Sequence, residues 1–242
     1  MILLPAIDIR GGKAVRLRQG DFDQETVYNE DPLEAARAWA EQGARFLHVI
    51  DLDGAREGAP ANLDHLERIS SELTVPVQYG GGLRNVAAVR AALGAGADRV
   101  ILGTAAYTDL DFLDGCIASW PSRVLVAIDV RDGRVSVAGW TKATQMRPDD
   151  VIERMQRRGV RQFVYTNVDR DGMLEGPDLD EVQRIGGIIR GRFLYSGGIG
   201  SLEDFRGLSS LRLVNLAGVV SGKALYEDRF TIADVHELLD AA

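Results

Sequence analysis

The feature that most constrains the fold of this 242-residue chain is a motif written twice, half a chain apart. The first copy is LLPAIDIRGGKAVRL, which begins at Leu3, and the second is VLVAIDVRDGRVSVA, which begins at Val124. Both run from apolar residues into Ala-Ile-Asp, so Asp8 and Asp129 hold the same position, 121 residues apart. The chain is therefore predicted to consist of two similar halves.

Three further blocks recur in the same order, with only small insertions between them. FLHVIDLDGAREGAPANLDHLERI at Phe46 resembles FVYTNVDRDGMLEGPDLDEVQRI at Phe163. QYGGGL at Gln78 resembles LYSGGI at Leu194, and GTAAY at Gly103 resembles GKALY at Gly222. The similarity therefore extends over each half of the chain.

Short apolar runs alternate with amphipathic stretches from end to end. The predicted strands are Ile2–Ile9, Arg45–Ile50, Val75–Tyr79, Arg99–Leu102, Arg123–Val130, Gln162–Asn167, Arg192–Ser196 and Asn215–Val220. The predicted helices are Pro32–Gln42, Leu63–Leu73, Val86–Leu93, Asp109–Ser119, Pro148–Arg158, Leu179–Gly186, Leu202–Leu208 and Ile232–Leu239. Eight strand–helix units indicate parallel strands covered by helices.

A twofold repeat of four such units closes on itself, so we predict an α/β fold of the (β/α)8 TIM-barrel type. About 250 residues is typical of that barrel. No linker-like segment interrupts the units, and we expect a single domain over 1–242. Its two half-barrels would span about 1–122 and 123–242.

Charge and cysteine content narrow the class of protein. The chain has 28 basic and 36 acidic residues, a net charge of −8, which argues against nucleic acid or an anionic membrane as the main partner. Its single cysteine, Cys116, allows no intrachain disulfide and suits a reducing compartment. Neither a signal-like segment nor an apolar run of about 18 residues is found. We expect a cytoplasmic, monomeric protein.

Strands 1 and 5 of such a barrel face each other across its axis, and chemistry occurs at the carboxyl ends of the strands. Asp8 and Asp129 follow those two strands, so duplication is predicted to place two carboxylates on opposite sides of one mouth. One would remove a proton from a substrate and the other would donate one. A paired carboxylate also suits a glycosidase, and a single such aspartate often only caps a turn.

Paired glycine-rich turns end four other strands. Glycine lets the backbone approach an anion, and the N–H groups that begin a following helix point at it. The loops after strands 7 and 8 are the usual phosphate site of these barrels, and the copies after strands 3 and 4 predict a second site opposite. We therefore expect an elongated substrate with a phosphate at each end, which counts against a glycosidase. The predicted phosphate-binding residues are Gly81, Gly82, Gly103, Thr104, Ser196, Gly197, Gly198, Gly222 and Lys223.

Other candidates lie around the same mouth. The long stretch 11–30, which holds Arg16, is interpreted as a lid, with a disordered loop as the alternative. Thr166 ends strand 6 and either binds the substrate or a carboxylate, or is plain structure. His48 on strand 2 is as readily a core histidine as a ligand contact.

Cofactor sites are not indicated by the sequence. Three histidines without metal-ligand spacing and one cysteine make a zinc site improbable. The glycine turns lack the pattern of a dinucleotide site after strand 1. We expect no metal and no cofactor.

Across its whole length the chain resembles the histidine-biosynthesis isomerases that act on N′-(5′-phosphoribosyl)formimino-5-aminoimidazole-4-carboxamide ribonucleotide. The resemblance is carried by LLPAIDIRGGKAVRLRQGDF, HVIDLDGA, QYGGGLRN, YTNVDRDGMLEGP, YSGGIGSLEDF and GVVSGKALY. It implies a duplicated barrel and a cofactor-free Amadori rearrangement of an aminoaldose to an aminoketose. The family's substrate carries two phosphates.

The resemblance also implies roles for individual residues. Asp8 resembles the base that removes the C2 proton, and Asp129 the acid that opens the ribose ring. Thr166 is similar to an assisting threonine, and Asp171 to an aspartate that reaches the site from a loop. Trp140 is also expected, with Arg16 and His48, among the residues of the substrate site or its lid.

Three rival functions stay in view. The sister cyclase of the pathway shares the paired aspartates but has Cys-Leu-Asp where this chain has Ala6-Ile7-Asp8. The bifunctional branch also isomerises phosphoribosylanthranilate and has Arg-Gly-Trp where this chain has Ala138-Gly139-Trp140. A non-catalytic sensor of phosphorylated ligands would keep the glycine turns without needing either aspartate.

Overall fold

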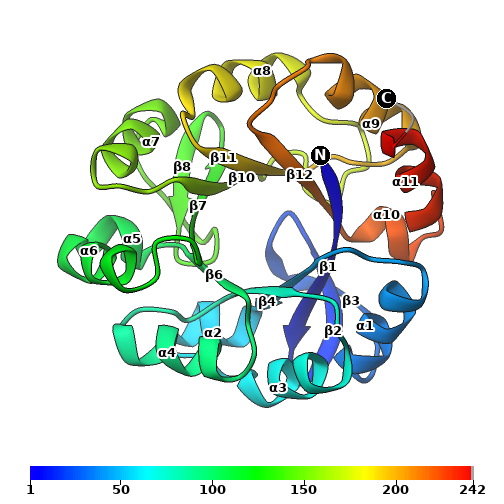
Figure 1. The fold of residues 1–242 in the computed structure, drawn as a ribbon, viewed down its shortest axis with the longest axis horizontal. Coiled ribbons are helices and arrows are strands. Elements are labelled where there is room, and N and C mark those ends of the chain that lie inside the picture. The colour runs from blue at the N-terminus through cyan, green and yellow to red at the C-terminus, as the bar shows by residue number, and fades with distance from the viewer. Residues whose placement is uncertain (241–242) are drawn as a thin grey trace.

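Eight parallel strands form the closed barrel at the centre of the protein, seen end-on in Figure 1. The computed structural model describes residues 1–240. The sheet closes because the first strand pairs with the last as well as with its successor. In order around the barrel the strands are β1 (Ile2–Arg10), β4 (Leu47–Asp51), β5 (Val77–Gly80), β6 (Arg99–Leu102), β7 (Val124–Arg131), β10 (Gln162–Asn167), β11 (Arg192–Ser196) and β12 (Leu216–Ser221). The predicted TIM barrel is confirmed.

Helices surround the barrel on its outer side (Figure 1). The eight that cover the strands are α1 (Pro32–Glu41), α3 (Leu63–Glu72), α4 (Val86–Gly94), α6 (Leu110–Ser119), α7 (Pro148–Arg157), α8 (Leu179–Ile188), α9 (Leu202–Ser210) and α11 (Ile232–Asp240). Three short helices that the sequence pattern did not predict follow strands directly: α2 (Leu52–Glu57), α5 (Ala105–Thr108) and α10 (Lys223–Tyr226). None of the described helices has the length and apolar character needed to cross a membrane.

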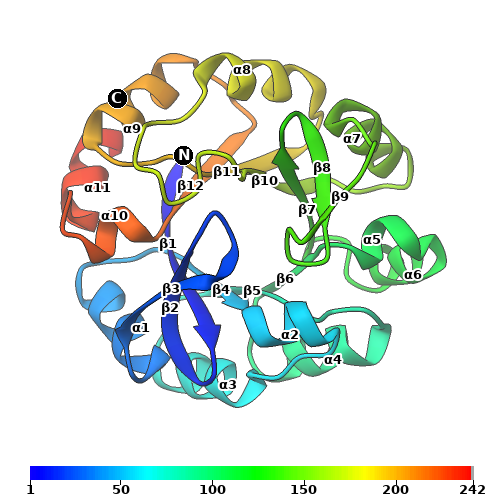
Figure 2. The ribbon, with the colours of Figure 1, turned by 180° about the vertical axis from the view of Figure 1, so that it is seen from behind.

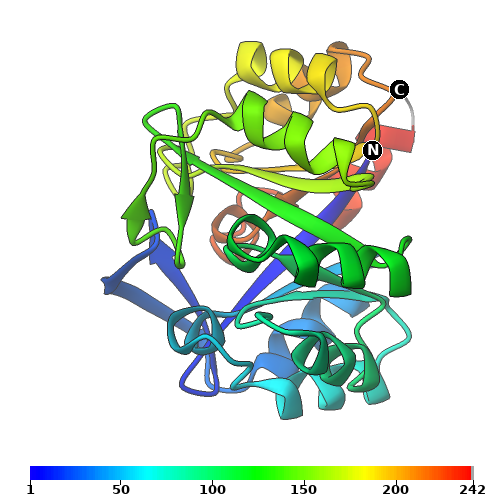
Figure 3. The same ribbon diagram turned by 90° about the vertical axis from the view of Figure 1, so that its left-hand side faces the viewer.

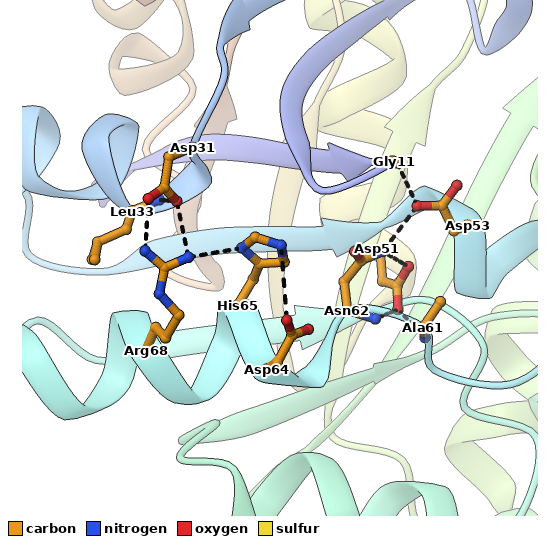
Figure 4. Close-up of polar contacts among 10 residues, drawn as sticks. All are labelled: Gly11, Asp31, Leu33, Asp51, Asp53, Ala61, Asn62, Asp64, His65 and Arg68. Atoms are coloured by element: carbon orange, nitrogen blue, oxygen red, sulfur yellow. Dashed lines mark hydrogen bonds and ion pairs between the residues drawn. The ribbon is translucent and has the colours of Figure 1, made fainter.

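Local sequence explains where the helices begin. Asp31 caps α1 by accepting a hydrogen bond from the Leu33 amide at 3.0 Å, and Pro32 takes the first helical position, where its missing N–H costs nothing. The Asp31 carboxylate also pairs with Arg68 of α3 at 2.6 Å, next to His65 (Figure 4). This cap therefore fixes both the start of α1 and its contact with its neighbour.

Two separate layers of apolar side chains hold the barrel together. Inside the barrel, the packed residues are Leu4, Ala6, Ile101, Leu125, Ala127, Val164, Leu194 and Val220. The larger layer lies between the strands and the helices and includes the fully buried Leu3, Ile7, Leu47, Phe163 and Phe193. Successive side chains along one strand therefore pack into different layers, because they point to opposite faces of the sheet. Both cores leave the carboxyl ends of the strands free to carry polar groups.

The disordered loop considered as the alternative over residues 11–30 is wrong, because most of that stretch is a β-hairpin, and its role as a lid stays a prediction. Strand β2 (Lys13–Arg18) pairs antiparallel with the end of β1, and β3 (Asp21–Asn29) pairs with β2. Gly11-Gly12 and Gln19-Gly20 make the two tight turns, and all four residues have φ between 49° and 75°. Two-residue turns with positive φ at both positions match the twist of a hairpin.

The second half of the chain carries a matching hairpin. Strand β8 (Arg134–Val137) turns back on β7 through Asp132-Gly133, again with φ positive at both residues, and β9 (Lys142–Ala143) follows. Figure 2 shows both hairpins from the face opposite to Figure 1, and Figure 3 shows them projecting from the same end of the barrel. The carboxyl ends of the eight strands are therefore enclosed by one hairpin from each half.

Candidate active site

Asp8 and Asp129 occupy equivalent positions on β1 and β7, and both line the cavity at the mouth of the barrel. Each aspartate pairs with a residue near the end of the next strand of the barrel: Asp8 lies beside Ile50 of β4, and Asp129 lies beside Thr166 of β10. The two strands are separated by three others on one side and by three on the other. The predicted placement of two carboxylates across one mouth is therefore what the structure has.

Burial perturbs both carboxyl groups. It raises the pKa of Asp8 to about 6, although Arg16 lowers it by charge attraction. It also raises the pKa of Asp129 to about 6, against hydrogen bonds from Thr166 and Trp140 that lower it. A carboxyl group whose pKa approaches neutrality exchanges a proton readily at physiological pH. Both are suited to acid–base work, in different surroundings: Asp8 beside a cation, Asp129 beside neutral donors.

Arg16 links Asp8 to Asp171. Its guanidinium lies 2.8 Å from the Asp8 carboxylate and 3.4 Å from that of Asp171. Burial raises the pKa of Asp171, while Arg16 and Lys223 oppose the shift. Arg16 is on β2, so the hairpin and not a loose lid delivers this charge to the barrel.

The burial of Asp129 predicts a pH-dependent stability. Its folded-state pKa of about 6 lies above the ordinary 3.8, so the folded protein holds this proton more tightly. The stabilisation from that proton is complete below pH 4 and is lost as the pH rises through 6. Asp129→Asn has no charge to bury, and we expect it to raise the unfolding free energy at pH 8 by roughly 2–3 kcal/mol over wild type.

Urea unfolding of both proteins between pH 4 and pH 8 measures this effect. The difference between variant and wild type should shrink towards zero as the pH falls to 4. Asp180→Asn, which removes an exposed carboxylate from α8, is the control for loss of charge. A difference that stays constant across this range would contradict the burial argument.

Trp140 and Thr166 both reach Asp129, and the loop that carries Trp140 is unusual. Ala138, Gly139 and Trp140 have φ of 56°, 61° and 68°, three left-handed residues in a row. Such conformations cost energy for residues other than glycine and persist only where contacts hold them. One contact is the Ala138 amide, which donates to the Thr104 hydroxyl at 2.8 Å.

His48 is held in one protonation state by its neighbours. Arg99 donates to the side-chain oxygen (Oε1) of Gln78 at 3.0 Å, which turns the side-chain nitrogen of Gln78 towards Nδ1 of His48. Burial lowers the pKa of His48 to about 3, so the ring is neutral. Because Nδ1 accepts a hydrogen bond, the ring proton is on Nε2. His48 lines the cavity, so this neutral imidazole is a donor available there.

The first glycine set has structural reasons for being glycine. Gly81 and Gly82 have φ of 115° and 70° and line the cavity together with Gly103 and Thr104. A Cβ on Gly81 would lie 2.1 Å from the Asp51 carbonyl oxygen, and one on Gly82 would lie 2.5 Å from the Ala59 backbone. One side of these turns therefore packs tightly against the backbone of Asp51 and Ala59, and the other side borders the cavity.

The second glycine set borders this cavity only in part. Ser196 lines the cavity, but its lining residues do not include Gly197, Gly198, Gly222 or Lys223. The Arg16 guanidinium packs on Gly222, where a Cβ would lie 2.8 Å from Cζ, and Lys223 donates to the Gly172 carbonyl at 3.0 Å. Arg16 of β2 therefore contacts one member of this set, and the second phosphate site stays a prediction.

A buried carboxylate that the motif analysis did not single out supports the first set. Asp51, at the end of β4, is fully buried and accepts hydrogen bonds from Gly54, Ala61 and Asn62 backbone amides, the Asn62 side chain and the Tyr79 hydroxyl, all within 3.0 Å. Figure 4 shows part of this network. An aspartate directly after a buried strand, followed by Asp-Gly, was the available signal.

Each hairpin is anchored by an aspartate that follows the next strand of the barrel. Asp53 accepts from the Gly11 amide at 2.7 Å (Figure 4), and Asp169 accepts from the Asp132 amide at 2.8 Å. Gly11 and Asp132 begin equivalent turns of the two halves. The duplication therefore includes the supports of the mouth as well as its carboxylates.

Within residues 1–240, no three histidine, cysteine, aspartate or glutamate side chains come together in a way that could hold a metal ion. The polar side chains of the mouth come from many strands and both hairpins. Fold and site together define an α/β-barrel enzyme with a carboxylate from each half at its mouth.

Comparison with known proteins identifies the family. The model of the histidine biosynthesis protein family matches residues 2–231, and the chain belongs to this family. A protein of Desulforudis audaxviator is 49% identical over 97% of this chain and 89% of its own length. Proteins of Synechocystis (43% identical, 97% and 91% covered) and Listeria monocytogenes (41%, 98% and 98%) are also similar. All three are named 1-(5-phosphoribosyl)-5-((5-phosphoribosylamino)methylideneamino)imidazole-4-carboxamide isomerase.

Proposed function

We propose that this chain is a histidine-biosynthesis isomerase. It would convert the imidazole-carboxamide aminoaldose, for which its relatives are named, into the corresponding aminoketose. The observation that carries the proposal is the pair of buried carboxylates on β1 and β7, each with a raised pKa, in unlike surroundings. Two carboxyl groups at one mouth take opposite roles when their environments differ. Family membership supports the same reaction.

In the proposed mechanism Asp129 acts first, as an acid. It gives a proton to the ring oxygen of the aminoaldose while the nitrogen lone pair opens the ring and forms a C1=N bond. Burial raises the pKa of Asp129 to about 6, so a fraction of this carboxyl group carries a proton near neutral pH.

Asp8 then acts as the base. Its carboxylate removes the C2 proton, the electrons of that C–H bond form C1=C2, and the C1=N bond returns to a single bond. The enol so formed tautomerises to the C2 ketone by losing the proton of its C2 hydroxyl and gaining one at C1, so the product has the composition of the substrate. Arg16, 2.8 Å from Asp8, favours the ionised form that a base requires.

Substrate binding is proposed to use both glycine sets. Gly81, Gly82, Gly103 and Thr104 border the cavity and would hold one phosphate through backbone N–H groups. The other phosphate would lie at Ser196, Gly197, Gly198, Gly222 and Lys223. Arg16 packs on Gly222 in this structure, so the β2–β3 hairpin must shift before that phosphate enters.

A single activity fits the mouth better than the bifunctional alternative. The anthranilate substrate has one phosphate fewer and needs a partner for its carboxylate, for which an arginine is the natural choice. Ala138 stands at that place. Arg131 lies nearby, but it donates to the main-chain carbonyls of Gln19 and Trp140, at 2.6 and 3.2 Å. These hydrogen bonds would have to break before Arg131 could pair with the anthranilate carboxylate.

Assay of the purified protein with both substrates tests the proposal. We expect turnover of the histidine-pathway aminoaldose, with phosphoribosylanthranilate at least about 100-fold poorer in kcat/KM because its carboxylate is left unpaired. Ala138→Arg should raise the second activity, since position 138 already holds a side chain at φ 56°. Ala138→Leu is the control for size without charge. Absence of the first activity would refute the proposed function.

We also propose that the protein acts as a cytoplasmic monomer. Its only exposed large apolar side chains among the described residues are Val27, Val86 and Val214, which belong to separate segments. Subunit interfaces use contiguous apolar patches. Light scattering of the eluted protein should give the mass of one chain, and a dimer mass at micromolar concentration would contradict this.

A further inference from the structure

The tip of the β2–β3 hairpin lies against the loop that follows β8, where the two halves of the chain meet over the mouth. Gly20 packs on the Trp140 ring so closely that a Cβ would lie 2.3 Å from it. Gln19 donates from its side chain to the Asp169 carbonyl at 2.7 Å, across 150 positions of sequence. The hairpin of the first half is therefore held by the second half.

Arg131, at the end of β7, makes the central contact of this junction. It donates to the Gln19 carbonyl oxygen at 2.6 Å and to the Trp140 carbonyl oxygen at 3.2 Å. A planar guanidinium with several fixed N–H groups can bind two acceptors at once, which a single ammonium group does less well. Arg131 thus ties the hairpin tip to the Trp140 loop.

Arg10, the equivalent arginine of the first half, shows that the contact between the two halves is particular to Arg131. Arg10 holds the place on β1 that Arg131 holds on β7, two residues beyond the aspartate of each strand. Arg10 donates to the Phe22 carbonyl at 2.7 Å and pairs with Glu25, and so holds only the hairpin of its own half. Arg131 is the member of the pair that reaches across to the other half.

The junction is connected to both carboxylates of the site. Asp129 lies two residues before Arg131 on the same strand and is hydrogen-bonded by Trp140, whose carbonyl Arg131 holds. Arg16 lies three residues before Gln19 in the hairpin and pairs with Asp8. Closure of the tip therefore sets the position of groups that contact both Asp8 and Asp129.

We propose that Arg131 is a positioning residue for the isomerisation, a clasp that holds the β2–β3 hairpin closed over the mouth. This role rests on the proposed function only for its catalytic consequence. The clasp itself is a property of the protein without substrate, because both of its acceptors are main-chain carbonyls. It opens to admit the substrate and closes again once the substrate is bound.

Hydrogen exchange of the substrate-free protein tests the clasp directly. Arg131→Met keeps the length of the side chain and removes its donors, and we expect amides of residues 13–29 to exchange about tenfold faster. Amides of α8 should be unchanged, as should every amide in the control Arg134→Met, which changes an exposed arginine on β8. Arg131→Lys should restore part of the protection. Should Arg131→Met fail to fold, Gln19→Ala releases the same tip from its exposed side.

Kinetics with the histidine-pathway aminoaldose separate positioning from a general structural role. Arg131→Met should raise KM about tenfold with a smaller change in kcat, since closure stabilises the bound state, whereas Asp8 and Asp129 themselves are held by barrel strands and only their contacts to the hairpin and its neighbouring loop loosen. Arg131→Lys should recover part of the KM, and Arg134→Met should match wild type. Unchanged exchange in the hairpin, or equal losses in Arg131→Met and Arg134→Met, would overturn the clasp. Absence of isomerisation in wild type would refute the proposed function and leave the exchange result standing.

Discussion

Replacing either Asp8 or Asp129 by asparagine is expected to lower kcat for the isomerisation at least about 100-fold, the lower end of what a positioned acid or base contributes. Asparagine keeps the shape of the side chain but neither accepts nor releases the proton. Each carboxyl group has a pKa of about 6, so each exchanges protons near neutral pH in wild type. Steady-state rates of the purified variants measure the loss.

KM should change little in both variants, because the phosphates dominate substrate binding. Asp180→Asn serves as the control, since it removes a carboxylate from the exposed side of α8. Near-normal turnover in one of the two variants would remove the acid–base role of that aspartate. The other assignment would survive, because the two residues act at different steps.

Asp51→Ala is expected to give the largest loss of stability, about 4 kcal/mol in the free energy of unfolding. Its carboxylate is fully buried and accepts five hydrogen bonds, so alanine leaves five donors without their partner. Removing one side of a buried charged hydrogen-bond network costs about 3–5 kcal/mol. That is a large part of the 5–15 kcal/mol typical of a folded protein. Urea unfolding measures the difference.

Asp64→Ala on α3 is the matched control, because its side chain is 74% exposed and it lies only two residues after Asn62 of the same network. We expect it to cost less than about 1 kcal/mol. An Asp51→Ala protein as stable as the control would mean that the network around Gly54, Ala61 and Tyr79 reforms without its carboxylate.

The barrel could be predicted from the sequence because its signals are local and repeated. Strands such as Gln162–Asn167 and Arg192–Ser196 match the structure residue for residue, and Val75–Tyr79 is shifted only to Val77–Gly80. Short continuous apolar runs indicate strands that are buried on both faces, and helix caps indicate where each helix begins. The division into half-barrels of about 1–122 and 123–242 remains a prediction.

The hairpin over 13–29 was missed for a physical reason. The side chains of β3 are largely exposed, so that strand lacks the apolar alternation of a half-buried sheet, although β2 buries Ala14, Val15 and Leu17. The available signals were Gly11-Gly12 and Gln19-Gly20, pairs suited to two-residue turns. Gln19 weakened the second signal, because residues other than glycine, asparagine and aspartate rarely take positive φ.

The sequence by itself determined the barrel, the equivalence of Asp8 and Asp129, and the glycine turns, because each depends on short stretches whose burial and backbone conformation are encoded locally. Only the tertiary structure decided that Arg16 pairs with Asp8 and Asp171, that it packs on Gly222, and that Arg131 holds Gln19. Those contacts join residues as many as 155 positions apart. Repetition shows that two halves are alike, but contacts between unlike surfaces of the halves arise only when the barrel closes and brings both hairpins to one mouth.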